Sequence, residues 1–384
     1  MEIVEELAQA ARTRPEKLKQ YKEEGIKIIG YTGRFVPEEL IYACGAIPYL
    51  MCRGGEPEPP EAVLPYMLRF MSPFARAQMG YYLLNMDPVV PNLDLIIAQC
   101  DDCHMARLAD LIEYFKLPAI RIGVPPDWGK TLSANYYYRG LARLKGKLEE
   151  ATGNKISNES LEKSIVSLNK IRGLLKQISL LRKQKPPPIG GYDFIRLNHY
   201  SFYRDLDEQI DELTPLYEQL KEKKSPFREE APRILLAGHV VALGDYIVPK
   251  LIEDAGGVIV AESLDEGMRH CLWNVKAEGD LMTNLGETYY LERTPPSIFQ
   301  PAWAKRIEFI KNVVEDYEVD GVVWYQLSFE EIYDMECSVV SKGMREMKIP
   351  FLKLESSYEY VREAMAPLIT RIESFIESIK QHRS

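Results

Sequence analysis

The stretch "LDLIIAQCDDCHMARLADLIEYFKLPAIRIGV" (residues 93–124) decides the fold. It opens with a continuous apolar run, residues 93–100, that ends in polar residues, as is typical of a strand buried in a parallel sheet. Amphipathic spacing after Cys103 predicts a helix, and residues 117–125 form a second short apolar strand. A strand, a helix and another strand in succession indicate an α/β domain.

A second unit of the same layout follows later in the chain. Apolar runs predict its strands at residues 232–241, 258–263, 319–327 and 349–356. The intervening segment is long, charged, periodic and almost free of strand formers, so it predicts helices. We therefore expect an α/β domain over residues 1–135, a helical region over 136–230, and a second α/β domain over 231–384 that ends in a helix.

Composition limits the classes of partner. The chain has 384 residues, is 46% apolar and carries a net charge of -9, without the clustered basic face that nucleic acids or membrane surfaces require. The start "MEIVEELAQAART" is acidic rather than signal-like, and no apolar run approaches the ~20 residues that span a bilayer. These features predict a cytoplasmic protein with no nucleic-acid or membrane partner, where structural disulfides are rare.

One segment imitates a phosphate-binding loop. "GVPPDWGKT" (residues 123–131) resembles G-x-x-x-x-G-K-[ST], but it has one residue too many between its glycines. Two of those residues are prolines, which lack the N–H groups that cradle phosphate. The chain therefore has no credible phosphate loop, and we expect no ATP hydrolysis by it alone.

The cysteines need a different explanation from cross-linking. They are Cys44, Cys52, Cys100, Cys103, Cys271 and Cys337. Cys100 and Cys103 form a Cys-x-x-Cys pair with His104 directly after it, which is compatible with a redox dithiol, a zinc site or an iron–sulfur site. A redox dithiol normally lies in a smaller domain of another layout, and structural zinc normally needs a second close pair. For Cys44, an inert buried thiol is an equal alternative.

The placement of most cysteines favours iron and sulfide. Cys52, Cys271 and Cys337 each follow a predicted strand, as the Cys-x-x-Cys pair does. Ligands collect at the carboxyl ends of parallel strands, so thiolates from several segments could converge on one cleft. Candidate proton donors near strand ends are His104, His239 and His270, and Arg269 could balance cluster charge.

Five ordered blocks resemble one known family. The blocks are "FVPEELIYACGAIPYLM", "SPFARAQMGYYL", "LDLIIAQCDDCHMARLADLIEYF", "LIEDAGGVIVAES" and "IPFLKLESSYE". In this order, over about residues 25–378, they resemble signatures of the 2-hydroxyacyl-CoA dehydratase and benzoyl-CoA reductase component family. The resemblance implies two flavodoxin-like parallel-sheet domains, an additional helical region and an iron–sulfur cluster between the domains. It also implies low-potential electrons from a separate activating iron–sulfur ATPase.

The chain departs from the usual cluster ligands of that family. A typical dehydratase subunit holds one [4Fe-4S] cluster with three cysteines, and only Cys100 matches one of them here. Ser72 and Glu330 stand at the other two places. The double-cubane branch of the family joins two cubanes through a bridging sulfide and uses three thiolates for each. The resemblance to that branch implies that all six cysteines are metal ligands. From their places near predicted strand ends, His104 and His270 are the expected proton donors.

The function predicted by this resemblance is an ATP-dependent reductase component. It would take electrons from the activating ATPase and reduce small molecules at a double-cubane cluster, as a homodimer. The alternative is a subunit of a 2-hydroxyacyl-CoA dehydratase or benzoyl-CoA reductase with a single [4Fe-4S] cluster. A zinc-binding or cluster-binding scaffold without activity is a third class.

Overall fold

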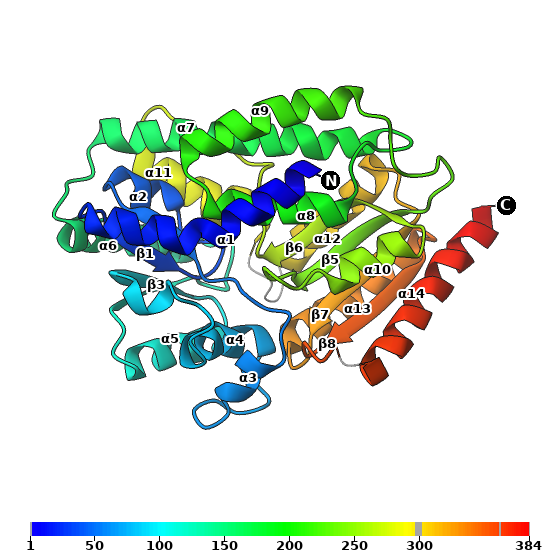
Figure 1. Ribbon diagram of the computed structural model, residues 1–384, viewed down its shortest axis with the longest axis horizontal. Coiled ribbons are helices and arrows are strands. Elements are labelled where there is room, and N and C mark those ends of the chain that lie inside the picture. Colours follow the sequence, from blue (N-terminus) through cyan, green and yellow to red (C-terminus); the bar gives the residue numbers. More distant parts are fainter. Residues whose placement is uncertain (1, 296–301, 361, 384) are drawn as a thin grey trace.

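The computed structural model describes residues 2–295, 302–360 and 362–383, and it contains two parallel four-stranded sheets (Figure 1). The first sheet has the order β2-β1-β3-β4, with β1 (Ile28–Tyr31), β2 (Ile47–Leu50), β3 (Leu95–Cys100) and β4 (Ala119–Gly123). The second has the order β6-β5-β7-β8, with β5 (Arg233–Val240), β6 (Val258–Glu266), β7 (Gly321–Leu327) and β8 (Phe351–Ser356). The prediction of two parallel α/β units is confirmed.

Burial on both faces explains the apolar runs. Every residue of β5 and β7 is buried, because helices cover both faces of a parallel sheet. In the first sheet, β3 lies between β1 and β4 and has a buried centre. One boundary differs from expectation: β6 runs on to Glu266 instead of ending at residue 263. This extension carries Asp265 and Glu266 to the carboxyl edge of the sheet.

Helices of the first domain pack around its sheet (Figure 1). They are α2 (Glu38–Ala43), α3 (Glu58–Ala62), α4 (Pro73–Leu83), the 3₁₀ turn η1 (Val90–Asn92) and α5 (Cys103–Tyr114). The start of α5 is fixed by Asp102, whose side chain accepts a hydrogen bond from Met105 N at 2.7 Å. Ser72 caps α4 in the same way, through Ala75 N at 3.3 Å.

The helical region lies across both domains. In Figure 1, α7 and α9 run along the upper side of the molecule above both sheets. Its elements are α6 (Thr131–Thr152), α7 (Asn158–Leu180), η2 (Leu181–Lys183), α8 (Gly191–Tyr200), η3 (Ser201–Tyr203) and α9 (Leu206–Glu222). The N-terminal helix α1 (Glu2–Glu23) of the first domain packs against α8. A buried ion pair of 2.6 Å between Arg172 of α7 and Glu39 of α2 ties this region to the first domain. A second buried pair, Arg182 with Glu262 of β6, ties it to the second.

The second domain adds its own helices and direct contacts to the first. Its helices are α10 (Ile247–Asp254), α11 (Leu281–Gly286), the π-helix η4 (Glu287–Glu292), α12 (Ala302–Asp316), α13 (Glu331–Glu346) and α14 (Arg362–Arg383). Beyond β5, Leu243 N donates to Cys52 O at 2.8 Å, and Gly54 N donates to Leu243 O at 3.1 Å. These two backbone hydrogen bonds join the segments that leave β2 and β5. None of the described helices is both long and apolar enough to cross a membrane.

Candidate functional site

Polar side chains from both domains meet where the carboxyl ends of β3, β5, β6 and β7 face one another. We call this group the interdomain acid cluster. Its members are Ser72, Gln99, Asp101, Asp102, His104, His239, Glu266 and Glu330. Each follows or ends a strand, or lies at the start of a helix, which is where α/β sheets place their ligand sites.

Gln99 connects the two sheets. Its amide Nε2 donates to Asp101 Oδ2 at 2.8 Å and to Glu266 Oε1 of the second domain at 3.2 Å. Its Oε1 accepts a hydrogen bond from Phe35 N at 2.7 Å. Gly33 is required beside it, because its φ is +80° and a Cβ there would lie 2.1 Å from Gln99 Cδ. Gln99 is therefore fixed on both sides and positions the two carboxyl groups.

Burial favours protons on the carboxyl groups of this cluster. It raises the pKa of Glu266 to about 7, against the opposing charges of Arg34 and His239. Burial and the neighbouring Asp102 and Glu266 raise the pKa of Asp101 well above its usual range. The pKa of Asp102 is raised by burial and by Glu330. Near neutral pH these groups therefore share protons instead of all being ionised.

His239 and Glu330 form a buried ion pair inside the cluster. His239 Nδ1 lies 3.2 Å from Glu330 Oε1, and the two side chains are 6% and 2% exposed. Burial opposes a charge on His239, but the Glu330 carboxylate outweighs it and raises the pKa of His239 to about 9. Burial likewise opposes ionisation of Glu330, yet His239 and the Ser72 hydroxyl lower its pKa. At neutral pH the pair is an imidazolium facing a carboxylate.

The two predicted proton donors lie in different places. His104 belongs to the cluster: its Nδ1 accepts from Ser72 N at 3.2 Å, and its Nε2 lies 3.4 Å from Glu331. His270 lies outside it, with Nε2 3.1 Å from Asp265 O. Burial lowers the pKa of His270 to about 3, so its ring is neutral and unsuited to give up a proton at neutral pH.

Such an arrangement can hold and move protons among buried side chains. An imidazolium with a pKa of about 9 carries a proton that it can donate at neutral pH. Carboxyl groups with raised pKa values also hold protons and can return one to the imidazole after each transfer. The sequence placed His239 among the candidates, but it gave no sign of Glu266, because the predicted strand ended too early. The sequence feature that points to this site is the pair of acidic residues after β3, Asp101 and Asp102.

Most of the chain matches one family. The profile described as "2-hydroxyglutaryl-CoA dehydratase, D-component" covers residues 34–379. The chain belongs to this family. The predicted resemblance to the 2-hydroxyacyl-CoA dehydratase and benzoyl-CoA reductase components is thereby confirmed, while its double-cubane branch stays a prediction.

Relatives of known description agree with the family over almost their full lengths. The chain is 24% identical to the putative dehydratase subunit YjiM of Escherichia coli (strain K12), with 98% of each chain covered. It is 24% identical to the beta subunit of (R)-2-hydroxyglutaryl-CoA dehydratase from Acidaminococcus fermentans, covering 98% of this chain and 99% of the relative. A benzoyl-CoA reductase component from Thauera aromatica is 23% identical, with 92% and 91% covered.

This member of the D-component family differs at the places where the resemblance implies cluster thiols. Ser72 and Glu330 both lie in the interdomain acid cluster, held there by His104 and His239. Cys100 ends β3 and lines a surface cavity with Leu132 and Tyr136. Two of the three places therefore hold oxygen side chains that already have protein partners.

The structure does not bring the six thiols together. Cys44 ends α2, where its Sγ contacts Ile41 O at 3.1 Å, and Cys103 is exposed at the start of α5. Cys337 comes after the end of β7, as expected, but it is buried within α13 among apolar side chains. In the described part of the chain, no three His, Cys, Asp or Glu side chains form a group that could hold a metal ion. The thiols as arranged do not fit a cubane, which needs three thiolates at one place.

Cys52 and Cys271 are buried in separate surroundings. A Cβ on Gly267 would lie 3.2 Å from Cys52 Sγ, so this thiol packs against the segment after β6. Burial raises the pKa of Cys271 to about 11, although Arg182 nearby lowers it. Neither thiol is poised as a thiolate at neutral pH.

Proposed function

We propose that this chain is the proton-handling subunit of an ATP-coupled enzyme of the 2-hydroxyacyl-CoA dehydratase and benzoyl-CoA reductase class. The observation that carries the proposal is the buried ion pair between His239 and Glu330, set among carboxyl groups with raised pKa values between two α/β domains. Family membership over residues 34–379 supports the class of reaction.

Both reaction types of this class need a proton donor that water does not reach freely. Loss of water from a 2-hydroxyacyl thioester requires one proton on the departing hydroxyl oxygen, which leaves as water. Reduction of an aromatic ring requires one proton for each electron added. The His239 imidazolium can give its Nε2 proton to such an oxygen or carbon, while its Nδ1 faces Glu330, and Glu330 then faces a neutral ring.

A second protein completes the proposed enzyme. Because Ser72 and Glu330 occupy the places of two expected thiols, we assign the electron-carrying cluster to a non-identical partner subunit rather than to this part of the chain. A separate activating ATPase would supply the low-potential electrons, since residues 123–131 lack the N–H groups of a phosphate loop.

The test is reconstitution under anaerobic conditions. We expect turnover of a 2-hydroxyacyl-CoA or of benzoyl-CoA only when this chain, its partner subunit, the activating ATPase and ATP are all present. Product is measured by chromatography of the thioesters, with omission of each component as the control. Dithionite-driven turnover by this chain alone, at the rate of the ATP-coupled system, would overturn the proposal.

The second candidate is the ATP-dependent reductase with a double-cubane cluster, working as a homodimer on molecules of the acetylene or hydrazine kind. The cysteine count of six favours it, as three thiolates for each of two cubanes. It requires Cys44, Cys52, Cys100, Cys103, Cys271 and Cys337 to move together on cluster loading.

Iron and sulfide analysis of anaerobically purified protein separates the candidates. The double-cubane candidate requires about eight iron atoms per chain, a single [4Fe-4S] cluster about four, and the proposal above none. Because a bound cluster needs its thiolates, single Cys→Ala changes at the six positions should each lower the iron content if the double-cubane candidate is correct. Zinc without iron would indicate the scaffold class. Reduction of acetylene without turnover of thioesters would also favour this second candidate.

A further inference from the structure

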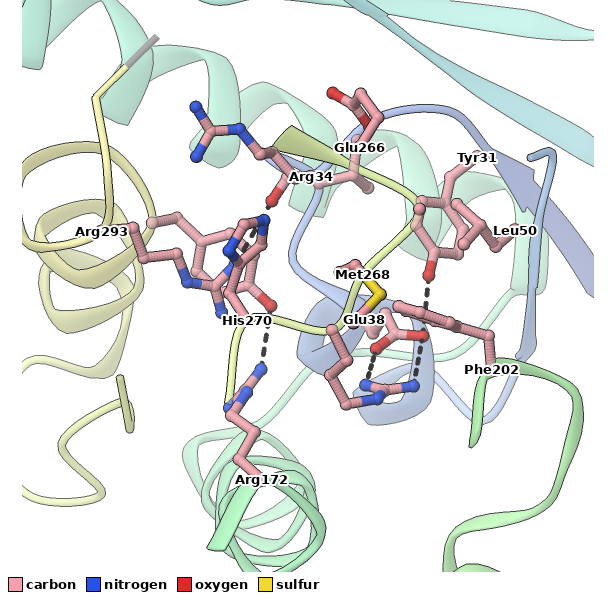
Figure 2. A pocket seen from close by; sticks show the side chains of 15 residues that line it. Tyr31, Arg34, Glu38, Leu50, Arg172, Phe202, Glu266, Met268, His270 and Arg293 are labelled. Carbon is pink, nitrogen blue, oxygen red and sulfur yellow. Dashed lines mark hydrogen bonds and ion pairs between the residues drawn. The ribbon is translucent and has the colours of Figure 1, made fainter. Parts of the chain in front are cut away.

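A small cavity beside the interdomain acid cluster is lined by four arginine side chains (Figure 2). They are Arg34, Arg172, Arg269 and Arg293. The walls come from the segment after β1, from α2 and α7, from residues 266–270 after β6, and from the residue that follows the π-helix η4. Four guanidinium groups around one cavity concentrate positive charge, so their partners decide what the cavity can bind.

Three of these arginines have a carboxylate partner. Arg172 pairs with Glu39 at 2.6 Å, and Arg269 pairs with Glu38. Arg34 Nη2 lies 3.6 Å from Asp265 Oδ1. The two carboxyl groups that line the cavity are also engaged, since Glu38 accepts from the Tyr31 hydroxyl at 2.8 Å and Glu266 accepts from Gln99. These ion pairs balance the charges of Arg34, Arg172 and Arg269.

Arg293 is the exception. Its side chain is buried, with the residue 4% exposed, and in the part of the chain that the structure describes no carboxylate forms an ion pair with it, although the Glu39 carboxylate attracts it from farther away. Its Nε has no hydrogen-bond partner, and its Nη1 donates to Arg34 O at 3.3 Å. The guanidinium stacks on the Tyr289 ring at 3.6 Å and extends toward His270 in Figure 2. A buried cation with no carboxylate in direct contact is costly unless an anion joins it.

The size of the cavity limits that anion. Its volume is ≈ 30 Å³, and a water-sized group needs roughly 10–15 Å³ on this measure, so about two such groups fit. A planar anion with two oxygens on one carbon has this size and matches the fork of a guanidinium group. A phosphate or a nucleotide is too large.

We propose that this cavity binds a small planar monoanion of the size of formate, held by Arg293. The anion oxygens accept hydrogen bonds from the Arg293 guanidinium, with Arg34 on the adjoining wall. This site goes beyond the proposed acyl-CoA chemistry, because it shares only Glu266 with the interdomain acid cluster and uses neither His239 nor Glu330.

Binding of formate to the full-length chain tests the proposal. We expect ¹³C-formate, at constant ionic strength with chloride as the replaced salt, to bind and to raise the melting temperature of the wild-type chain. Arg293→Gln should weaken formate at least about tenfold, because it removes the charge and the fork. Arg293→Lys keeps the charge but loses the forked geometry of the guanidinium, so its affinity for formate should lie between those of the wild type and Arg293→Gln. The matched control is Arg107→Gln, an exposed arginine paired with Asp110 on α5, which should bind as the wild type does.

A melting curve without formate separates binding from a structural role. Because no carboxylate contacts the buried charge of Arg293 directly, Arg293→Gln should melt no lower than the wild type when formate is absent. Unchanged formate affinity in Arg293→Gln, or a lower melting temperature that formate does not influence, overturns the proposal. Butyrate binding as tightly as formate overturns the enclosed, small-anion site.

Discussion

Replacing His239 with glutamine is expected to lower turnover of the reconstituted enzyme by about 100-fold or more, the usual size of a lost general acid. Glutamine fills a similar volume and can still contact Glu330, but it has no proton to give at neutral pH. The measurement is the rate of thioester conversion with saturating ATP, partner subunit and activating ATPase. Retention of more than about a tenth of the rate would exclude His239 as the donor.

The control for this variant is His199→Gln. His199 is buried and contacts the Tyr246 hydroxyl at 2.9 Å, and burial lowers its pKa to about 3, so its ring is neutral like glutamine. We expect this control to keep its activity, because it lies outside the interdomain acid cluster. A comparable loss in both variants would mean that buried histidines support the fold rather than the reaction.

The pH dependence of stability gives a second measure of His239. Its pKa is raised to about 9 in the folded chain, above the ordinary value of 6.5. The stabilisation is therefore complete below pH 6.5 and is lost as the pH rises through 9. The difference in unfolding free energy between wild type and His239→Gln should shrink across this window. A difference that stays constant from pH 6 to 9.5 would contradict the ion pair.

Replacing Arg172 with methionine is expected to lower the free energy of unfolding by about 3–5 kcal/mol, the cost of leaving a buried charge unpaired. Arg172 and Glu39 are 1% and 0% exposed, and they join α7 to α2. After the change, Glu39 keeps the hydrogen bond from the Tyr289 hydroxyl at 2.8 Å but loses its ion-pair partner. Urea unfolding followed by circular dichroism measures the loss, which is a large part of the 5–15 kcal/mol that a typical native protein has.

Two further variants show that the loss comes from the unpaired charge. Arg172→Met combined with Glu39→Leu should recover most of the stability, because well-packed apolar side chains often replace a buried ion pair without loss. Lys147→Met removes an exposed pair with Glu150 and should change stability by less than about 1 kcal/mol. If the double variant is no more stable than Arg172→Met, the packing of Arg172 matters more than its charge.

The strands could be predicted from the sequence because apolar runs in a parallel sheet reflect burial on both faces, which is a local property. Residues 93–100 and 319–327 show this directly as β3 and β7. The predicted strand ends at residue 263, because two acidic residues, Asp265 and Glu266, follow Leu264 in the sequence. In the structure β6 continues, and Glu266 pairs with Val240 of β5. That error hid one carboxyl group of the site.

The site itself depends on contacts that sequence spacing does not contain. Gln99 and Glu266 meet across two domains, and nothing local to either residue announces the other. The cysteines show the opposite difficulty: their positions near strand ends suggested convergence, but which way a side chain points is set by packing. Cys337 faces an apolar core and Cys44 the end of a helix, for reasons of shape and burial alone.

The two backbone hydrogen bonds between Cys52, Gly54 and Leu243 have a mechanical consequence. Each sheet lies within one domain, so each domain is expected to move as a rigid body. The two hydrogen bonds join these domains directly. A movement of one domain relative to the other must either pivot about these hydrogen bonds or break them. Hydrogen exchange of the Gly54 and Leu243 amides therefore reports on domain motion. Pivoting leaves the exchange of both amides slow, whereas separation of the domains makes both exchange at the rate of opening.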